Sequence, residues 1–388
     1  MMNILMYRYL SICEPDVKES FERLGVNIIE VWKQNYKDDK ELVENIAKVL
    51  QERAYMFVFS INFHPFVSEV CKILKVKYIS WVVDAPLLTL FSPSVKNSNN
   101  KIFIFDSMQW ERVKDFNPGN IIYFPLGTNQ NQNESVISSI TDFERKKFTS
   151  DVSFVGSLYT EKCPYDQFNT LPEYEKAYLD AIIDVQTKIY GYNLCEEMIS
   201  DEMLESIKKY TDFYHLSPGW EECEKYIVAH MYLGAKVTEK ERIHLLGLLS
   251  NHYNVDLYTY GKTEFLPRIN NKGTASSHRE QKIIFQLSKI NLNITSKPIM
   301  TGLSLRVWDV MGSGGFLLSN YQEEIEDYFV IGEDLEVFSS EEELVEKVGY
   351  YLEHDDIREK IARNGYEKVR KYHSYDERIK QMIGYLLD

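Results

Sequence analysis

The sequence lacks the features that mark several common classes of protein. No apolar run in its 388 residues approaches the roughly 18–20 residues that cross a bilayer, so we expect no transmembrane segment. Cysteine is scarce. The five residues are an odd number, are widely spaced and include no C-x-x-C pair, which favours reduced thiols over disulfides or a zinc site. They are Cys13, Cys71, Cys163, Cys195 and Cys223.

Basic residues are few relative to acidic ones. Lys and Arg number 44 against 59 Asp and Glu, a formal charge of −15, which would repel nucleic acid and anionic lipid over most of the surface. A phosphate-bearing ligand must then be bound by a local group of donors. The N-terminus runs directly into an apolar strand pattern without a charged leader or cleavage site, so we expect a cytoplasmic protein.

Spacings typical of metal sites are also missing. No D-x-D occurs, and the eight histidines show neither H-x-x-x-H nor H-E-x-x-H spacing. We therefore expect no metal ion and no resident cofactor. Neutralisation of a bound phosphate is left to side chains and helix N-termini.

The length suits two domains, and two lobes imply a cleft between them. Residues 1–130 alternate short apolar strands with helical stretches, which is typical of a parallel sheet covered on both faces, a Rossmann-like lobe. The first strand is followed by YRYLSICEP rather than G-x-G-x-x-G, so binding of a dinucleotide there is not expected.

The polar segment 131–150 has the composition of a linker, and the second domain is expected over 151–388. Its strands are expected at DVSFVGSLY, VDLYTYG, INLNIT, GFLLS and DYFVIG. A helical stretch from about Glu173 to Leu249 indicates a helical insertion over about 160–240, and the residues from Glu341 onward are typical of consecutive helices. Both domains are thus α/β.

The stretch Ile290–Asn320 is the most informative about function. Its sequence predicts a strand, a loop, an amphipathic helix, a turn and a second strand. Leu303, Val307, Val310 and Met311 form a buried stripe at helical spacing, while Arg306, Asp309 and Ser313 fall on another face. Gly302 allows close backbone approach and Ser304 is the expected N-cap. The N–H groups of the first turn and the helix dipole favour an anion at this end of the helix.

Four segments in this order resemble the CgeB-like spore-maturation glycosyltransferase family, of the GT-B superfamily. They are YISWVVDAP (Tyr78–Pro86), YFPLGTN (Tyr123–Asn129), DVSFVGSLY (Asp151–Tyr159) and GLSLRVWDVMGSGGFLLSN (Gly302–Asn320). The resemblance covers most of the chain outside the insertion at about 160–240. It implies two Rossmann-like lobes and transfer of a sugar from a nucleotide sugar, expected to be a UDP-sugar, without the metal of the GT-A type. The donor would bind the second lobe and the acceptor, a glycan, glycolipid or protein, the first.

The resemblance also implies a role for one side chain and the lack of another. Asp309 matches the acidic residue that binds the nucleotide ribose, although here it is Asp rather than the commoner Glu. The acidic residue that many such enzymes use to hold the donor sugar would fall within 300–303, where this sequence has none. Thr301 and backbone amides are the replacements available.

Three further residues are candidates for binding the donor. The guanidinium of Arg306 can neutralise two phosphate oxygens. Alternatively, Arg306 forms only an i,i+3 ion pair with Asp309 on a solvent-exposed face of the helix. Lys262, in YGK after a strand, would add a second positive charge to the donor site. The alternative is that it is an ordinary surface lysine. Gly156, directly after DVSFV, lets the backbone approach a phosphate, or makes a tight turn.

The candidate catalytic residues lie in the first domain. His64 in INFHP and Asp84 in WVVDAP each follow a strand, and both strand ends should lie at the same edge of the sheet. An inverting transfer needs a base for the acceptor hydroxyl, and the apolar flanks of Asp84 favour its burial. Asp84 could instead brace the turn before Pro86, and a retaining enzyme would need neither residue as a base.

Two other functions stay open from the sequence. A sugar-nucleotide epimerase also uses two such lobes around a nucleotide sugar. A catalytically inactive nucleotide-binding or coat protein of the same fold would be consistent with the missing acidic residue at 300–303.

Overall fold

The computed structural model describes residues 2–161 and 163–387, and it divides into two compact units. The first unit contains the chain up to Asn129, the short segment Leu216–Glu222 and the C-terminal segment from His373. The second contains Gln130–His215 and Cys223–Tyr372. Each unit is built on a six-stranded parallel sheet. The predicted α/β fold with two Rossmann-like sheets is confirmed.

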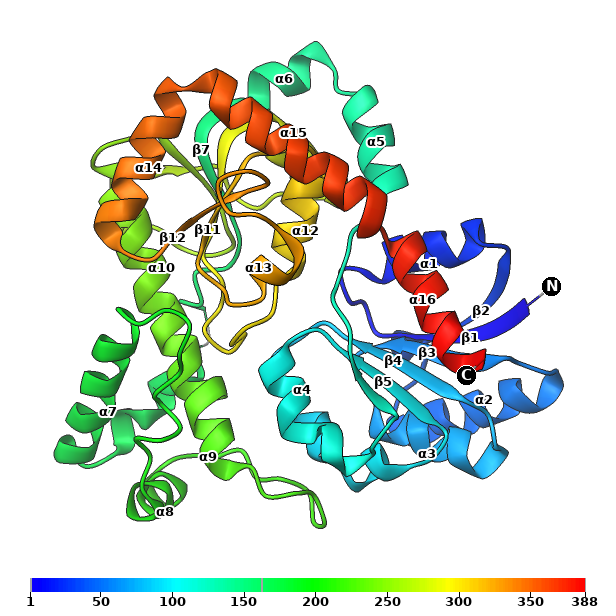
Figure 1. The fold of residues 1–388 in the computed structure, drawn as a ribbon. Helices are drawn as coiled ribbons and strands as arrows, with labels where there is room; N and C mark the ends of the chain where they lie inside the picture. Colours follow the sequence, from blue (N-terminus) through cyan, green and yellow to red (C-terminus); the bar gives the residue numbers. More distant parts are fainter. Residues whose placement is uncertain (1, 162, 388) are drawn as a thin grey trace. The chain divides into compact units, whose positions relative to one another are not determined.

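The sheet of the first unit has the strand order β2-β1-β3-β4-β5-β6. The expected alternation of short strands and helices is present, because most of the strands are short apolar runs bounded by polar residues. Helices α1 (Glu14–Arg23) and α16 (Tyr375–Leu387) cover one face and α2 (Asp39–Glu52) and α3 (Pro65–Leu74) the other, with α4 (Ser107–Val113) after β5 (Figure 1). The strands are β1 (Met2–Arg8), β2 (Val26–Trp32), β3 (Phe57–Ile61), β4 (Tyr78–Val82), β5 (Asn100–Ile104) and β6 (Ile121–Tyr123).

The sheet of the second unit has the order β12-β11-β10-β7-β8-β9. Its apolar core is formed by strand residues such as Leu292 and Leu318 together with residues of the covering helices such as Leu246. The strands are β7 (Ser150–Val155), β8 (Val255–Tyr258), β9 (Asn270–Asn271), β10 (Ser288–Asn293), β11 (Leu317–Asn320) and β12 (Glu336–Phe338). The helices around them are α10 (Gly234–Ser250), α11 (His278–Leu287), α12 (Leu305–Gly312), α13 (Ile325–Tyr328), α14 (Glu341–Glu353) and α15 (Asp355–Tyr372).

The prediction of a strand at DYFVIG was wrong. The segment begins in α13 and then turns, because Asp334 accepts a hydrogen bond from Val330 N at 2.8 Å and Gly332 adopts φ +81°. The apolar run is therefore bent, and the last strand of the sheet is β12, which pairs in parallel with β11.

The helical insertion is present but is not one long helix. It contains α7 (Glu173–Gln186), α8 (Asp201–Tyr210) and the short α9 (Glu224–Tyr226), with irregular chain between them. A π-helical turn at Ile227–Leu233 leads into α10. The apolar spacing predicted helix over this range, but turn-forming residues such as Gly191 and Gly219, both at positive φ, interrupt it.

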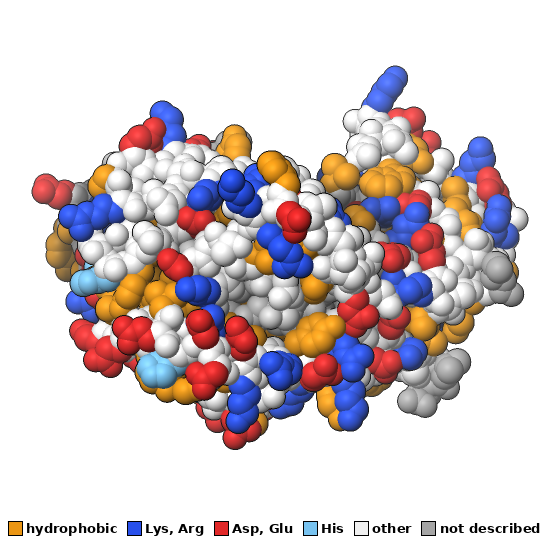
Figure 2. Space-filling model, turned by 90° about the horizontal axis from the view of Figure 1, so that it is seen from above, with side chains coloured by type: hydrophobic (Ala, Val, Ile, Leu, Met, Phe, Trp, Pro, Cys, Tyr) orange, Lys and Arg blue, Asp and Glu red, His pale blue; other side chains and the backbone are white. Residues whose placement is uncertain are grey.

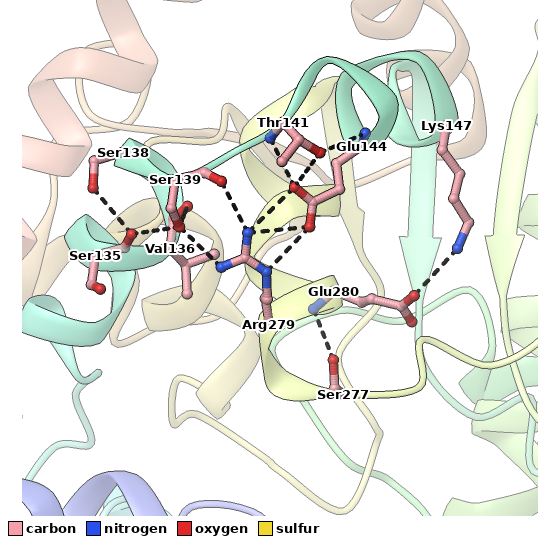
Figure 3. Close-up of polar contacts among 10 residues, drawn as sticks. All are labelled: Ser135, Val136, Ser138, Ser139, Thr141, Glu144, Lys147, Ser277, Arg279 and Glu280. Atoms are coloured by element: carbon pink, nitrogen blue, oxygen red, sulfur yellow. Dashed lines mark hydrogen bonds and ion pairs between the residues drawn. The ribbon is translucent and has the colours of Figure 1, made fainter.

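The segment 131–150, expected to be a linker, is folded into α5 (Gln130–Ser138) and α6 (Asp142–Phe148). Thr141 and Glu144 form a capping box at the start of α6. Arg279 of α11 donates to Ser139 Oγ at 3.0 Å and to Glu144 Oε1 at 3.2 Å, and Lys147 contacts Glu280 at 3.3 Å (Figure 3). These contacts attach α5 and α6 to the second unit.

The division into units also differs from the expected second domain, 151–388, at its C-terminal end. The chain from His373 packs with the first unit, where Tyr375 N donates to Thr128 O at 2.9 Å and Arg378 Nε to Leu126 O at 2.9 Å. Asp376 forms an ion pair with Arg23 at 2.7 Å. Helix α16 therefore belongs to the first sheet.

Charges of both signs are interspersed over the face drawn in Figure 2. Across the described residues, none of the helices combines the length and apolar character required to cross a bilayer.

Candidate functional site

Helix α12 forms as predicted and is firmly anchored in the second unit. Leu303, Val307, Val310 and Met311 are each at most 2% exposed, which confirms the buried stripe. Gly314 at φ +76° ends the helix, because its N–H donates to Met311 O at 2.9 Å. The N-terminus of α12 is thus fixed after the carboxyl end of β10, where ligands of parallel sheets bind.

The loop leading into α12 is buried and tied to the following chain. Thr301 is 5% exposed and its carbonyl accepts from Glu324 N, while the Gly302 carbonyl accepts from Gln322 Nε2, both at 3.3 Å. Ser304 is the N-cap residue as expected, although its side chain makes no capping hydrogen bond. Val307 N donates to Ser304 O at 3.1 Å, and by helix geometry the N–H groups before it have no partner within the helix.

Arg306 lies on this first turn, with its guanidinium 4.7 Å above the ring of Phe285. Its Nη1 atom is buried and donates to no atom of the described residues. Burial lowers the pKa of Arg306, and the nearby carboxylate of Asp309 opposes this effect. A buried guanidinium nitrogen without an acceptor is costly, so Arg306 is suited to bind an anionic group of a ligand.

A second guanidinium, which sequence reasoning missed, lies nearby. Arg242 of α10 is buried, and its positive charge contributes to lowering the pKa of Arg306. It donates to Ser157 O at 2.7 Å and to Ile294 O at 3.0 Å, directly after β7 and β10. Arg242 therefore joins the ends of two central strands and adds positive potential beside Arg306.

The other predicted donor residues lie around the same edge of the sheet. Gly156 follows β7 and its N–H donates to Tyr258 O at 3.0 Å; a Cβ there would lie 3.2 Å from the Phe154 ring. Lys262 follows β8 and is exposed. Asp309 is half-buried on α12.

In the first unit, β3 and β4 are neighbours in the sheet, so His64 and Asp84 lie at the same edge as predicted. Asp84 is exposed rather than buried, because it lies in irregular chain beyond the end of β4. Asn62 Nδ2 donates to Asp84 Oδ2 at 2.6 Å, and Asn62 Oδ1 accepts from Val83 N at 3.0 Å. The carboxylate is accessible but fixed in place.

His64 lies in an aromatic environment beside Tyr7 and Tyr9, with ring centroids at 4.8 and 5.0 Å. Its Nε2 is 3.1 Å from Ile61 O, which favours the tautomer with the proton on Nε2. Burial lowers the pKa of His64 to about 4, an effect that Lys33 reinforces. The imidazole is therefore neutral at pH 7 and weakly basic.

Tyr9 connects these residues to a cavity. Its hydroxyl accepts a hydrogen bond from Asn62 Nδ2 at 2.8 Å, so one amide group touches both Tyr9 and Asp84. Tyr9 also lines a cavity of about 350 Å³ together with Leu10, Lys33, Gln34, Tyr36 and Lys37. Asn62 and Tyr9 are further residues that sequence reasoning missed.

Comparison with known proteins gives a consistent class. Residues 235–384 match the family described as "Glycosyl transferase-like", which is 150 of the 388 residues. No curated protein matches the sequence.

Several solved structures are similar over the whole chain. HepE from Anabaena in complex with UDP-glucose has a TM-score of 0.55 at 9% identity and covers 100% of both chains. A glycosyltransferase from Rickettsia africae has a TM-score of 0.53 at 10% identity, covering 100% of this chain and 99% of its own. Sucrose-phosphate synthase from Thermosynechococcus elongatus has a TM-score of 0.52 at 9% identity, covering 99% and 98%. At these identities the likeness establishes the fold.

The chain therefore has the GT-B fold, and its C-terminal part carries a glycosyl transferase-like domain. Membership of the CgeB-like subfamily remains a prediction.

Proposed function

We propose that the protein transfers a sugar from a UDP-sugar to a glycan, glycolipid or protein acceptor, without a metal ion. The second unit would bind the donor and the first unit the acceptor. The observation that carries the proposal is the buried, unpaired Nη1 of Arg306 on the first turn of α12, beside a second guanidinium and a helix N-terminus.

On the donor side, the diphosphate would lie at the start of α12. Backbone N–H groups of the first turn and Arg306 would neutralise the charge that develops on the leaving UDP. Asp309, one turn further along the helix, would bind the ribose. Thr301 and the backbone around Gly302 would contact the donor sugar, and Gly156 and Lys262 at neighbouring strand ends would border the same site.

On the acceptor side, Asp84 would be the general base of an inverting transfer. Its carboxylate would take the proton of the acceptor hydroxyl while that oxygen attacks the anomeric carbon, and the bond from that carbon to the UDP oxygen would break with its electron pair leaving on UDP. His64 is the weaker alternative, because burial lowers its pKa to about 4 and leaves the imidazole little basicity. A retaining transfer would require neither.

Metal independence rests on the donor set. Among residues 2–161 and 163–387, no group of three or more His, Cys, Asp or Glu side chains is arranged to hold an ion. Arg306, Arg242 and the helix N-terminus would supply the positive charge instead.

Measuring UDP release from UDP-sugars, with and without a panel of glycans as acceptors, tests the function. Release that depends on an acceptor, with formation of a glycosylated product, is the expected result. Release without an acceptor, accompanied by conversion of the sugar to its epimer, would indicate the epimerase. Absence of both UDP binding and turnover would indicate an inactive protein of this fold.

A further inference from the structure

A cavity of about 950 Å³ lies within the second unit, away from the residues assigned to the donor. Its walls come from the end of α7, from α10 and from the start of α14. None of the donor candidates described above lines it. The lining residues used below are Asp184, Thr187, Tyr190, Glu241, His244 and Glu341.

The cavity contains a carboxylate with unused hydrogen-bonding capacity. Glu241 is 3% exposed, and its carboxylate interacts with the side chains of Lys297 and Tyr190. Lys297 Nζ lies 3.1 Å from Oε1 and forms an ion pair with it. A carboxylate has about four acceptor positions, so these two neighbours leave Glu241 able to accept further hydrogen bonds from the donors of a ligand in the cavity.

The charges around the cavity favour a neutral ligand. Asp184 pairs with Lys240 at 2.6 Å, Glu341 lies 2.9 Å from His244 Nε2, and Glu241 itself is paired with Lys297. A cationic ligand would compete with these existing partners. A molecule that offers hydroxyl groups satisfies the carboxylate oxygens without disturbing the ion pairs.

The remaining walls also suit a polyol. Tyr190 provides an apolar ring and Thr187, Ser339 and Ser340 provide hydroxyls. A concave site with an aromatic side chain and a few polar groups of both donor and acceptor type is typical of small-molecule binding, and the volume lies within the range of about 300–1,000 Å³ common for such sites.

Through Lys297, the cavity adjoins the chain that leads to α12. The backbone N–H of Lys297 donates to Thr238 Oγ1 at 3.0 Å and its Nζ to Ile189 O at 3.2 Å. Lys297 lies in the loop between β10 and α12, and it thus contacts α10 through Thr238 and Glu241 and the helical insertion through Ile189.

We propose that this cavity is a second binding site for a neutral sugar, separate from the donor site, with Glu241 accepting hydrogen bonds from sugar hydroxyls. The proposal goes beyond the transferase function and does not depend on it. The protein would bind a sugar and UDP at the same time.

His244 provides a local reporter, since the chain has only eight histidines. The full chain is labelled with ¹³C-histidine, and the His244 signal is assigned with His244→Gln. Glucose, galactose, N-acetylglucosamine and sucrose are titrated separately, with spermidine as the cationic comparison and UDP as a separate titration. We expect at least one sugar to shift the His244 signal with saturation, with or without UDP present.

Glu241→Gln should weaken that sugar about tenfold or more, the worth of a hydrogen bond to a charged group. Glu346→Gln, on the exposed side of α14, is the control and should bind normally. Thr187→Trp, which fills the cavity without touching Glu241, should abolish binding and covers the case in which Glu241→Gln does not fold. The proposal is overturned if no sugar shifts His244, if only spermidine does, or if Thr187→Trp binds as well as wild type. Loss of UDP binding with the sugar response intact would instead count against the transferase function.

Discussion

The amide of Asn62 holds the carboxylate of Asp84 at 2.6 Å and the hydroxyl of Tyr9 at 2.8 Å. Asn62 adopts φ +55°, a left-handed conformation that Asn tolerates better than most residues. Its Oδ1 is used by Val83 N, so the orientation of the amide is fixed. Asp84 is therefore an exposed carboxylate whose position is set by a buried neighbour.

Asp84→Asn should lower turnover by about 100-fold or more, the usual worth of a positioned general base, while UDP affinity stays nearly unchanged. The reason is that Asp84 belongs to the first unit and the donor residues to the second. Steady-state kinetics and calorimetry measure the two effects. His64→Ala is the paired control: if it alone abolishes turnover, the base is His64, and if both variants stay active, a retaining mechanism without a base is the better account.

Asn62→Ala should lower turnover about tenfold, because the variant loses a hydrogen bond to a charged group, without changing the affinity for UDP. Asn27→Ala removes a comparable amide contact, to Asn3, elsewhere in the sheet. Equal loss of activity in both variants would leave Asn62 with only a structural role.

His64 makes the stability of the protein dependent on pH. Its pKa is about 4 in the folded state and near its ordinary value of 6.5 in the unfolded chain, so the unfolded state takes up the proton first as the pH falls. The free energy of unfolding should therefore decrease from about pH 6.5 to about pH 4, by at most about 3 kcal/mol from this residue. His64→Phe should flatten this slope in urea unfolding at pH 7 and pH 5. A slope equal to that of wild type would contradict the assignment.

Transfer should continue in EDTA, because the guanidinium groups and helix N-terminus supply the charge that a metal ion would otherwise provide. The measurement is product formation after exhaustive chelation, with a matched sample supplied with magnesium or manganese. Activity that disappears on chelation and returns with either ion would contradict this prediction.

The strands of both sheets were largely predictable, because runs such as FVFSI and YISWV are mostly apolar and are buried at every position. The predicted strand at DYFVIG failed because the side chain of Asp334, two residues beyond its end, accepts a hydrogen bond from Val330 N and bends the backbone there. The linker prediction relied on composition, which does not reveal that Arg279, far away in the sequence, holds Ser139 and Glu144 in place.

The same limit applies to the candidate site. Arg306, Asp84 and His64 follow strands or a helix start, so their position in the sequence points to the ligand edge of a sheet. Arg242 sits in the interior of α10, and its contact with Ser157 spans 85 residues; no local pattern distinguishes it from an arginine that merely packs a helix. Asn62 could not be recognised from the sequence either, because its role depends on its hydrogen bonds with Tyr9, Asp84 and Val83 rather than on its residue type.

The central claim is that UDP binds at the start of α12 through Arg306, and isothermal titration of UDP into wild type and Arg306→Ala tests it most directly. We expect wild type to bind and the variant to lose about 1.5–3 kcal/mol of binding free energy, the value of a charge-assisted hydrogen bond. Arg370→Ala, which removes an exposed arginine paired with Glu367 on α15, should bind as wild type does. UDP affinity that is the same in wild type and in a folded Arg306→Ala variant would contradict the account.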